Sequence, residues 1–153
     1  MRPSNPSDDA VRGDDSGSAS LEFILAGVVM LVPLIYLVVT LGMLQAHALG
    51  VESAARHVAR SIATAADAAE GDARADRIVT AVAEEYGIDP STIEVDVSCT
   101  TSGACPAPGE VIVVTVSASA ALPLVPPLLG IDQAARVPVE AVAVQKVSRT
   151  WTG

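Results

Sequence analysis

Basic and aromatic residues are scarce in this chain, and their scarcity excludes several classes of protein. The 153 residues contain nine Lys and Arg, with a single lysine at Lys146, against 18 Asp and Glu, so the formal net charge is −9. Nucleic-acid binders need clustered Lys and Arg to contact phosphates, and this charge argues against that class. Aromatic residues make up only 3% of the chain although half of it is apolar. The apolar side chains are therefore mostly Ala and Val, which pack closely but build a modest core.

Motifs that bind phosphate, a dinucleotide or a catalytic zinc are also missing. The sequence has no phosphate loop, no Rossmann glycine pattern, no His-Glu-x-x-His and no Gly-x-Ser-x-Gly. Its two histidines, His47 and His57, are ten residues apart. On a helix that spacing is about 15 Å along the axis, too far to share a metal. The sequence therefore predicts no catalytic residue, no metal site and no cofactor.

The chain has only two cysteines, Cys99 and Cys105, in the stretch SCTTSGACP. A disulfide across so short a turn is geometrically easy in an oxidising compartment. The alternative is two unrelated thiols. A zinc site is disfavoured because the spacing is wide and no second ligand pair exists.

In contrast to these absences, the chain has one long hydrophobic segment, predicted as a transmembrane helix over residues 21–44. Its core, FILAGVVMLVPLIYLVVTLGML, carries no charge. Twenty-two helical residues span about 33 Å, enough for a bilayer core of about 30 Å. Pro33 can kink such a helix, which membrane helices tolerate. A fully buried helix of a soluble protein is the alternative.

The segments on either side of this helix differ in character. Residues 1–20 are polar, rich in Ser, Asp, Pro and Gly, and are predicted to form a disordered cytoplasmic tail. Residues 45–70 continue with helix formers, with apolar residues at helical spacing, and are predicted to extend the helix outside the membrane. Glu52, Arg56 and Arg60 are four residues apart and share one face of this extension.

A stripe of small residues also follows the helix at every fourth position: Gly42, Ala46, Gly50 and Ala54. Such a stripe lets another helix approach closely. The alternative is that an Ala-rich composition produces the stripe by chance.

Residues 71–153 are predicted to form a small extracytoplasmic α+β domain. DARADRIVTAVAEEYG has an apolar face at helical spacing, with Gly87 as its C-cap residue. The stretches STIEVDVSC, EVIVVTVSASA and ARVPVEAVAVQKVS predict a three-stranded antiparallel sheet, in which Pro138 favours an edge strand or a bulge. The apolar, proline-rich residues 122–130 cannot be a central strand. They either cover the core, which we favour, or contact a membrane or partner.

A carboxylate at the edge of the hydrophobic segment calls for an explanation. Glu22 follows Gly17 by five residues, and burying its charge in lipid is costly. One explanation is a cation nearby, such as the free amino terminus of a neighbouring subunit. The other is that Glu22 lies at the level of the lipid headgroups, one turn from the polar tail.

The stretch GSASLEFILAGVVMLVPLIYLVV, followed by ESAARHVARSIA, resembles the TadE-like family of tight-adherence (Flp) pilus assembly proteins. The family pattern has a glycine and small residues before a glutamate, then a hydrophobic helix with a proline and an Ala-Ala-Arg-x-x-Ala-Arg element. The resemblance covers about residues 16–63. The matching positions are Gly17, Ser18, Glu22, Pro33, Ala54, Ala55, Arg56, Ala59 and Arg60.

This resemblance implies a minor pilin or pseudopilin that is not an enzyme. It implies a single-pass protein of the cell membrane, with a cytoplasmic amino end and an extracytoplasmic C-terminal domain. The implied partners are other pilin-like subunits, the tight-adherence membrane machinery, membrane lipid and a prepilin peptidase that would cut between Gly17 and Ser18. Assembly and helix packing would use Glu22, Pro33, Gly42, Ala46, Gly50, Arg56 and Arg60.

Two other readings remain open from the sequence. AHA, residues 46–48, is an A-x-A site, and cleavage there would release residues 49–153 as a secreted or lipid-anchored extracytoplasmic binding module. Against this reading, the apolar run is longer than the 7–15 residues usual for a signal peptide. The third reading is a membrane-anchored structural subunit unrelated to pili.

Overall fold

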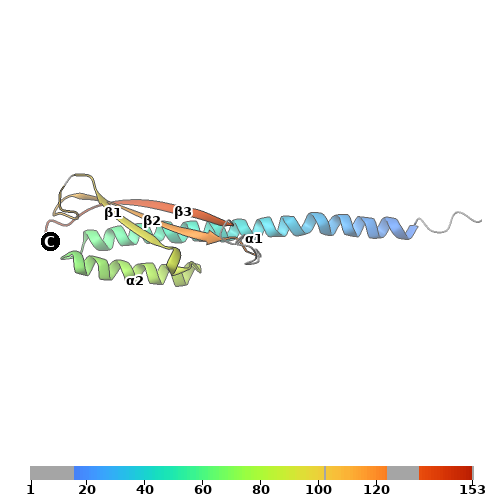
Figure 1. The fold of residues 1–153 in the computed structure, drawn as a ribbon, viewed down its shortest axis with the longest axis horizontal. Helices are drawn as coiled ribbons and strands as arrows, with labels where there is room; N and C mark the ends of the chain where they lie inside the picture. The colour runs from blue at the N-terminus through green and yellow to red at the C-terminus, as the bar shows by residue number, and fades with distance from the viewer. Residues whose placement is uncertain (1–15, 102, 124–134, 153) are drawn as a thin grey trace, which may run out of the picture. The chain divides into compact units, whose positions relative to one another are not determined.

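The computed structural model describes residues 16–101, 103–123 and 135–152, with side chains described from Ala19 onward. Within these ranges the chain is an α+β protein, as the sequence predicts (Figure 1). The tail before residue 16 and most of residues 122–130 lie outside the described residues. The elements are α1 (Ser16–Ala63), α2 (Ala68–Tyr86), the 3-10 turn η1 (Pro90–Thr92), β1 (Glu94–Cys99), β2 (Val111–Ala121) and β3 (Arg136–Lys146).

The chain divides into two units between Val39 and Thr40. The first, called here the helical unit, has residues 16–39 of α1 as its described part. The second, the α+β unit, begins at Thr40 and contains the rest of α1 and every other element. Helix α1 begins at Ser16, inside the range predicted as tail.

The helical unit is apolar, and its large apolar side chains are exposed. Phe23 is 81% exposed and Leu21 is 70% exposed, and the large aliphatic residues that follow them are at least half exposed. A helix of this length, with a mean hydropathy of 2.7 in its most apolar window, is long and apolar enough to cross a membrane. Pro33 lies within α1, which continues beyond it.

The α+β unit is built on a three-stranded antiparallel sheet with the order β1-β2-β3. The longest register joins β2 to β3, from the pair Val111 and Lys146 to the pair Ala121 and Arg136. Burial alternates strictly along β2, where the inward positions are Ile112, Val114, Val116, Ala118 and Ala120. This alternation follows from the two-residue period of a strand with one covered face.

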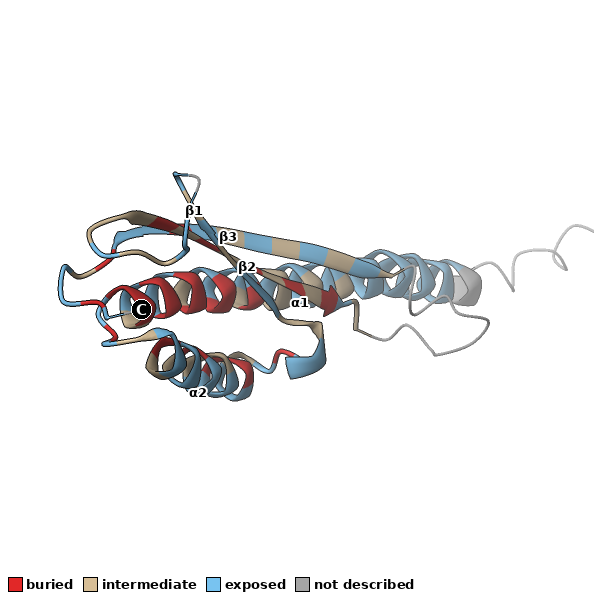
Figure 2. Ribbon diagram, turned by 60° about the vertical axis from the view of Figure 1, so that its left-hand side comes forward, coloured by how far each residue is buried: buried red, intermediate tan, exposed pale blue. Residues whose placement is uncertain are grey.

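The covering layer over this face of the sheet is the second half of α1. Its buried positions recur every three or four residues and include Val51, Val58 and Ile62. Small residues fill the positions between them, and Ala54, Ala55 and Ala59 are all buried. Figure 2 shows this buried stripe of α1 facing the sheet and α2. The core is therefore thin, as the Ala- and Val-rich composition predicts.

Helix α2 begins and ends at recognisable caps. At its start Asp67 accepts a hydrogen bond from the Glu70 amide at 2.8 Å, while Glu70 accepts one from the Ala66 amide at 2.8 Å. At its end Gly87 has a φ of 65°, a left-handed conformation that favours glycine. The predicted C-cap at Gly87 is confirmed.

Proline in β3 is accommodated because β3 is an edge strand. Pro138 lies opposite Ser119 on β2, and the sheet order leaves the other side of β3 unpaired. An edge strand can lose one backbone donor without breaking a ladder on that side. The predicted edge position of this strand is confirmed.

The single tryptophan closes the core of the α+β unit at the α1–α2 turn. Trp151 is only 5% exposed, and a Cβ on Gly71 would lie 3.7 Å from its ring. The backbone on both sides of Trp151 is hydrogen-bonded to the same turn. The Ser148 amide donates to the Ala63 carbonyl at 2.7 Å, and the Thr152 amide donates to the Ala66 carbonyl at 2.8 Å. No pattern in the sequence predicts this role of Trp151.

Candidate functional site

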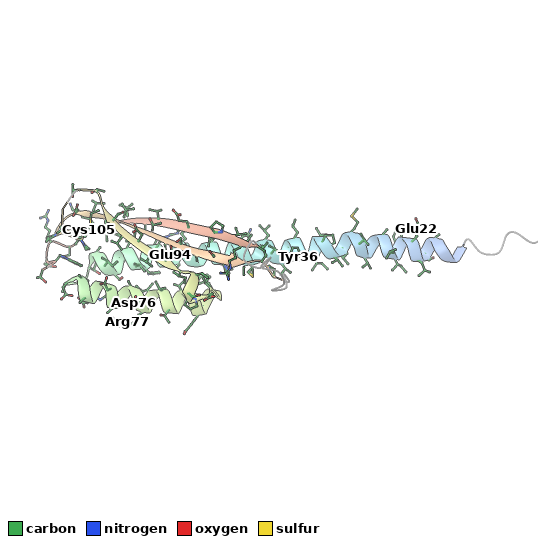
Figure 3. All side chains as sticks on the ribbon, in the orientation of Figure 1. Glu22, Tyr36, Asp76, Arg77, Glu94 and Cys105 are labelled. Atoms are coloured by element: carbon green, nitrogen blue, oxygen red, sulfur yellow. A yellow bond between two sulfur atoms is a disulfide. The ribbon has the colours of Figure 1, made fainter. Side chains whose placement is uncertain are left out.

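The predicted processing and register residues lie at the start of α1. Glu22 is an exposed side chain among exposed apolar neighbours (Figure 3). It makes no ion pair with any residue that the structure describes. Gly17 and Ser18 lie in the first turn of α1. Glu22 is therefore a carboxylate among exposed apolar side chains that pairs with no cation of the described residues, an arrangement that is costly in lipid.

The members of the small-residue stripe lie in two different environments. A Cβ at Gly42 would meet nothing within 4 Å. A Cβ at Gly50 would lie 2.8 Å from Tyr86 Cγ and 3.1 Å from Ile88 Cδ1. Gly50 is therefore used within the chain, where it lets the end of α2 approach α1. Ala54 is buried in the same core, so Gly42 and Ala46 are the members of the stripe that remain at least partly exposed.

The two arginines of the helix extension are both exposed on α1. Arg56 pairs with Glu52, one turn earlier on the helix. Arg60 has no carboxylate within ion-pair distance among the described residues. An exposed pair four residues apart on a helix contributes only about 0.3–0.5 kcal/mol. These arginines therefore contribute little to the stability of their own fold and remain accessible to a partner.

An open groove of about 290 Å³ lies beside Arg56, between α1 and the end of α2. Its lining offers several hydrogen-bond donors and one aromatic ring, from Leu49, Glu52, Ser53, Arg56, His57 and Tyr86. Sequence reasoning identified Arg56 but missed the groove, because nothing in the sequence pairs Tyr86 with this part of α1. The one indication in the sequence was Gly50. A glycine within a helix allows another element to pack closely, but it does not identify that element as the end of α2.

Both histidines lie on α1, in different surroundings. His47 is 7% exposed, and its Nδ1 has no hydrogen-bond partner among the described residues. His57 is exposed and lines the groove. No group of three His, Cys, Asp or Glu side chains in the described residues is placed to hold a metal ion.

The predicted disulfide is present between Cys99, the last residue of β1, and Cys105. Their Cα atoms are 5.8 Å apart, and they enclose part of the loop between β1 and β2. A hydrogen bond also spans this loop, because Glu110, immediately before β2, accepts one from the Thr101 amide at 3.1 Å. Disulfides persist in oxidising compartments and are rare in reducing ones.

Two carboxylates have a pKa below the ordinary range, and both are helix caps. The pKa of Glu70 is lowered chiefly by the hydrogen bond from the Ala66 amide, and further by the Arg74 guanidinium at 2.6 Å. The pKa of Asp89 is lowered by hydrogen bonds from the hydroxyl and amide of Ser91 at the start of η1. Both shifts arise from local capping, so they indicate structural rather than catalytic groups.

Comparison with known proteins adds no assignment, because no family model, no curated protein and no solved structure matches this chain. The resemblance to TadE-like proteins therefore rests on the residue pattern between positions 16 and 63. The described residues that stand out are an exposed apolar helix, the carboxylate of Glu22 and the exposed Arg56 and Arg60.

Proposed function

We propose that this chain is a membrane-anchored, pilin-like component of a tight-adherence pilus or a related secretion system. It acts by helix packing and assembly and catalyses no reaction. The observation that carries the proposal is the helical unit, whose apolar side chains are exposed and whose one described carboxylate, Glu22, makes no ion pair with a described residue. The family resemblance of residues 16–63 supports the same function.

The apolar surface of the helical unit needs an apolar environment. Leaving so many large side chains in water costs about 25 cal/mol for each Å² exposed, so lipid or neighbouring helices must cover them. A pilin-like helix meets both environments in turn, first in the membrane and then in a filament. Glu22 would gain an opposite charge only when the next subunit arrives, which makes it a register mark for assembly.

The α+β unit fits an extracytoplasmic location. Its disulfide between Cys99 and Cys105 requires oxidation, which the cytoplasm disfavours. This orientation leaves the tail before the helix in the cytoplasm, where a prepilin peptidase would cut after Gly17. The partners proposed are other pilin-like subunits and the tight-adherence membrane machinery.

Release of a soluble module after Ala48 is a weaker alternative. Cleavage there would remove residues 40–48 from the α+β unit, including the buried His47. It would also begin the new chain at Leu49, immediately before the buried positions Gly50 and Val51. A signal-peptide boundary that cuts into a packed core is unfavourable, so the anchored reading is preferred.

The deciding experiment is the amino-terminal residue of the protein recovered from its host membranes, read by mass spectrometry. A start at Ser18 supports pilin-type processing. A start at Leu49 contradicts the proposal and favours the secreted module. A start at Met1 leaves a membrane protein without pilin processing and removes the peptidase from the proposal.

A second experiment tests the carboxylate directly. Glu22→Ala is expected to abolish recovery of partner subunits with the full-length chain from crosslinked host membranes. Glu85→Ala is the matched control, because Glu85 is an exposed carboxylate of α2 without an ion pair among the described residues. Equal partner recovery with both variants would remove the assembly role of Glu22.

A further inference from the structure

The sheet of the α+β unit has one face packed against α1 and one face that no described element covers (Figures 1 and 2). The outward positions of β2 alternate with its buried ones and include Thr115 and Ser117. The strand register places neighbours from β1 and β3 on both sides of these two residues. The outer face of the sheet is therefore open to its surroundings within the described residues.

Two cross-strand rows of this surface are acidic, and together they are called here the acidic face. One row is Glu94, Ser117 and Glu140, and the next row is Asp96, Thr115 and Val142. The three carboxylates are exposed, and none makes an ion pair with a described residue. Glu94 and Asp96 lie two residues apart on β1, and Glu140 lies on β3 with β2 between them. Like charges on one sheet face repel one another, so a cationic partner lowers the energy of this surface.

The same unit carries a surface of complementary charge on α1, called here the arginine face. It consists of Arg56 with its groove and of Arg60, one turn further along the helix. Arg60 has no described ion-pair partner, and the Arg56–Glu52 pair is exposed and therefore weak. Ser53 and His57 add further hydrogen-bonding groups beside the groove.

The spacing of the charges matches as well as their sign. Arg56 and Arg60 are about 6 Å apart along the helix axis. Glu94 and Asp96 are two residues apart on β1, which is about 6.6 Å along a strand. Within one copy, no described ion pair joins the arginines of α1 to the carboxylates of the sheet. We propose that the arginine face of one copy docks on the acidic face of a second copy.

This contact joins two different surfaces, so it does not close a dimer. Each docked copy still offers a free acidic face or a free arginine face to the next copy. The inference deepens the proposed function, on which it rests for its biological setting, because it names the residues through which successive subunits meet. The contact itself uses only the α+β unit and requires neither Glu22 nor cleavage after Gly17.

The test is a charge exchange in the full chain held in detergent micelles, with self-association measured by analytical ultracentrifugation at low and high salt. Arg56→Glu with Arg60→Glu, and separately Glu94→Arg with Asp96→Arg, are each expected to raise the dissociation constant about tenfold or more at low salt. Each pair replaces attraction by repulsion in an exposed interface, where the effect is screened by salt. An equimolar mixture of the two variants is expected to recover association, since each then supplies the charge that the other lacks.

Two controls carry the same change in net charge on other surfaces. Asp72→Arg with Asp76→Arg changes exposed carboxylates of α2, and Arg77→Glu with Arg149→Glu changes exposed arginines. Both controls are expected to associate as the unmodified chain does. Unfolding curves of all variants, followed by Trp151 fluorescence, check that the α+β unit remains folded.

The outcomes separate cleanly. Weakening confined to the two interface variants, with recovery in the mixture, supports the contact. No self-association of the unmodified chain, equal weakening by the controls, or a mixture that stays dissociated overturns it. If the variants support this contact but Glu22→Ala leaves partner recovery unchanged, only the pilin-type role of Glu22 is rejected. If Glu22→Ala abolishes partner recovery but the variants overturn this contact, the contact is rejected and the proposed function stands.

Discussion

Gly50 is expected to control the packing of α2 on α1, and its replacement gives a prediction with a defined sign. In Gly50→Ala the new Cβ would lie 2.8 Å from Tyr86 Cγ and 3.0 Å from Tyr86 Cβ. The tyrosine cannot avoid it by turning its ring, because the contact is at the base of the side chain. The end of α2 must therefore move away, together with the buried Ile88, whose Cδ1 would be 3.1 Å away.

The magnitude follows from two opposing effects. Overpacking of this kind costs about 1–3 kcal/mol. Alanine is favoured over glycine in a helix interior by about 1 kcal/mol, which offsets part of that cost. We expect Gly50→Ala to lower the free energy of unfolding by up to about 2 kcal/mol. Gly42→Ala is the matched control, because nothing lies within 4 Å of that position, and it is expected to be neutral or mildly stabilising.

The assay is urea unfolding of the full chain in micelles, followed by the fluorescence of Trp151. This residue is the single tryptophan and is 5% exposed in the core of the α+β unit, so its signal reports that unit. In a Tyr86→Ala background the 2.8 Å contact with Cγ is gone, whereas the contacts with the Cβ of residue 86 and with Ile88 remain, so Gly50→Ala is then expected to cost clearly less than in the unmodified chain. If the substitution has the same effect with and without the Tyr86 ring, the close approach of α2 at this position is refuted.

Three further predictions concern the stability of the same unit. Replacing both Cys99 and Cys105 by serine is expected to lower the free energy of unfolding by about 2 kcal/mol, since the disulfide closes a loop with a sequence separation of only 6; an unchanged urea midpoint would contradict this. Trp151→Ala is expected to cost about 3–5 kcal/mol, measured by circular dichroism, because it opens a cavity between α1 and α2. Glu70→Gln is expected to cost stability above the ordinary glutamate pKa. The folded pKa is lowered, so the advantage of the native Glu70 is lost as the pH falls through that lower pKa; a difference that stays constant across this range would argue against the cap.

Much of the fold could be predicted because the signals are local. The alternation in β2, the glycine that ends α2 and the proline of β3 each depend on backbone geometry within a few residues. The disulfide was predictable for the same reason, since its two cysteines lie across one short loop. Local rules fix the type and order of these elements without knowledge of the tertiary packing.

What could not be predicted depends on contacts that are distant in sequence. Trp151 meets the turn between α1 and α2, and its backbone neighbour Thr152 bonds Ala66, 86 residues away. The groove beside Arg56 exists because Tyr86 is brought to α1. No periodic pattern records such pairings, and an Ala-rich helix offers several similar faces to choose from.

The role of the small-residue stripe shows how the structure narrows the assembly hypothesis. The sequence alone treats Gly42, Ala46, Gly50 and Ala54 as one surface for another helix. The fold already occupies the last two, since Gly50 receives Tyr86 and Ala54 is buried in the core. Of this stripe, only Gly42 and Ala46 are left for the close approach of a neighbouring subunit's helix in the proposed assembly. Any contact between the α+β units must use other surfaces, of which the arginine face and the acidic face are the pair with matching charge.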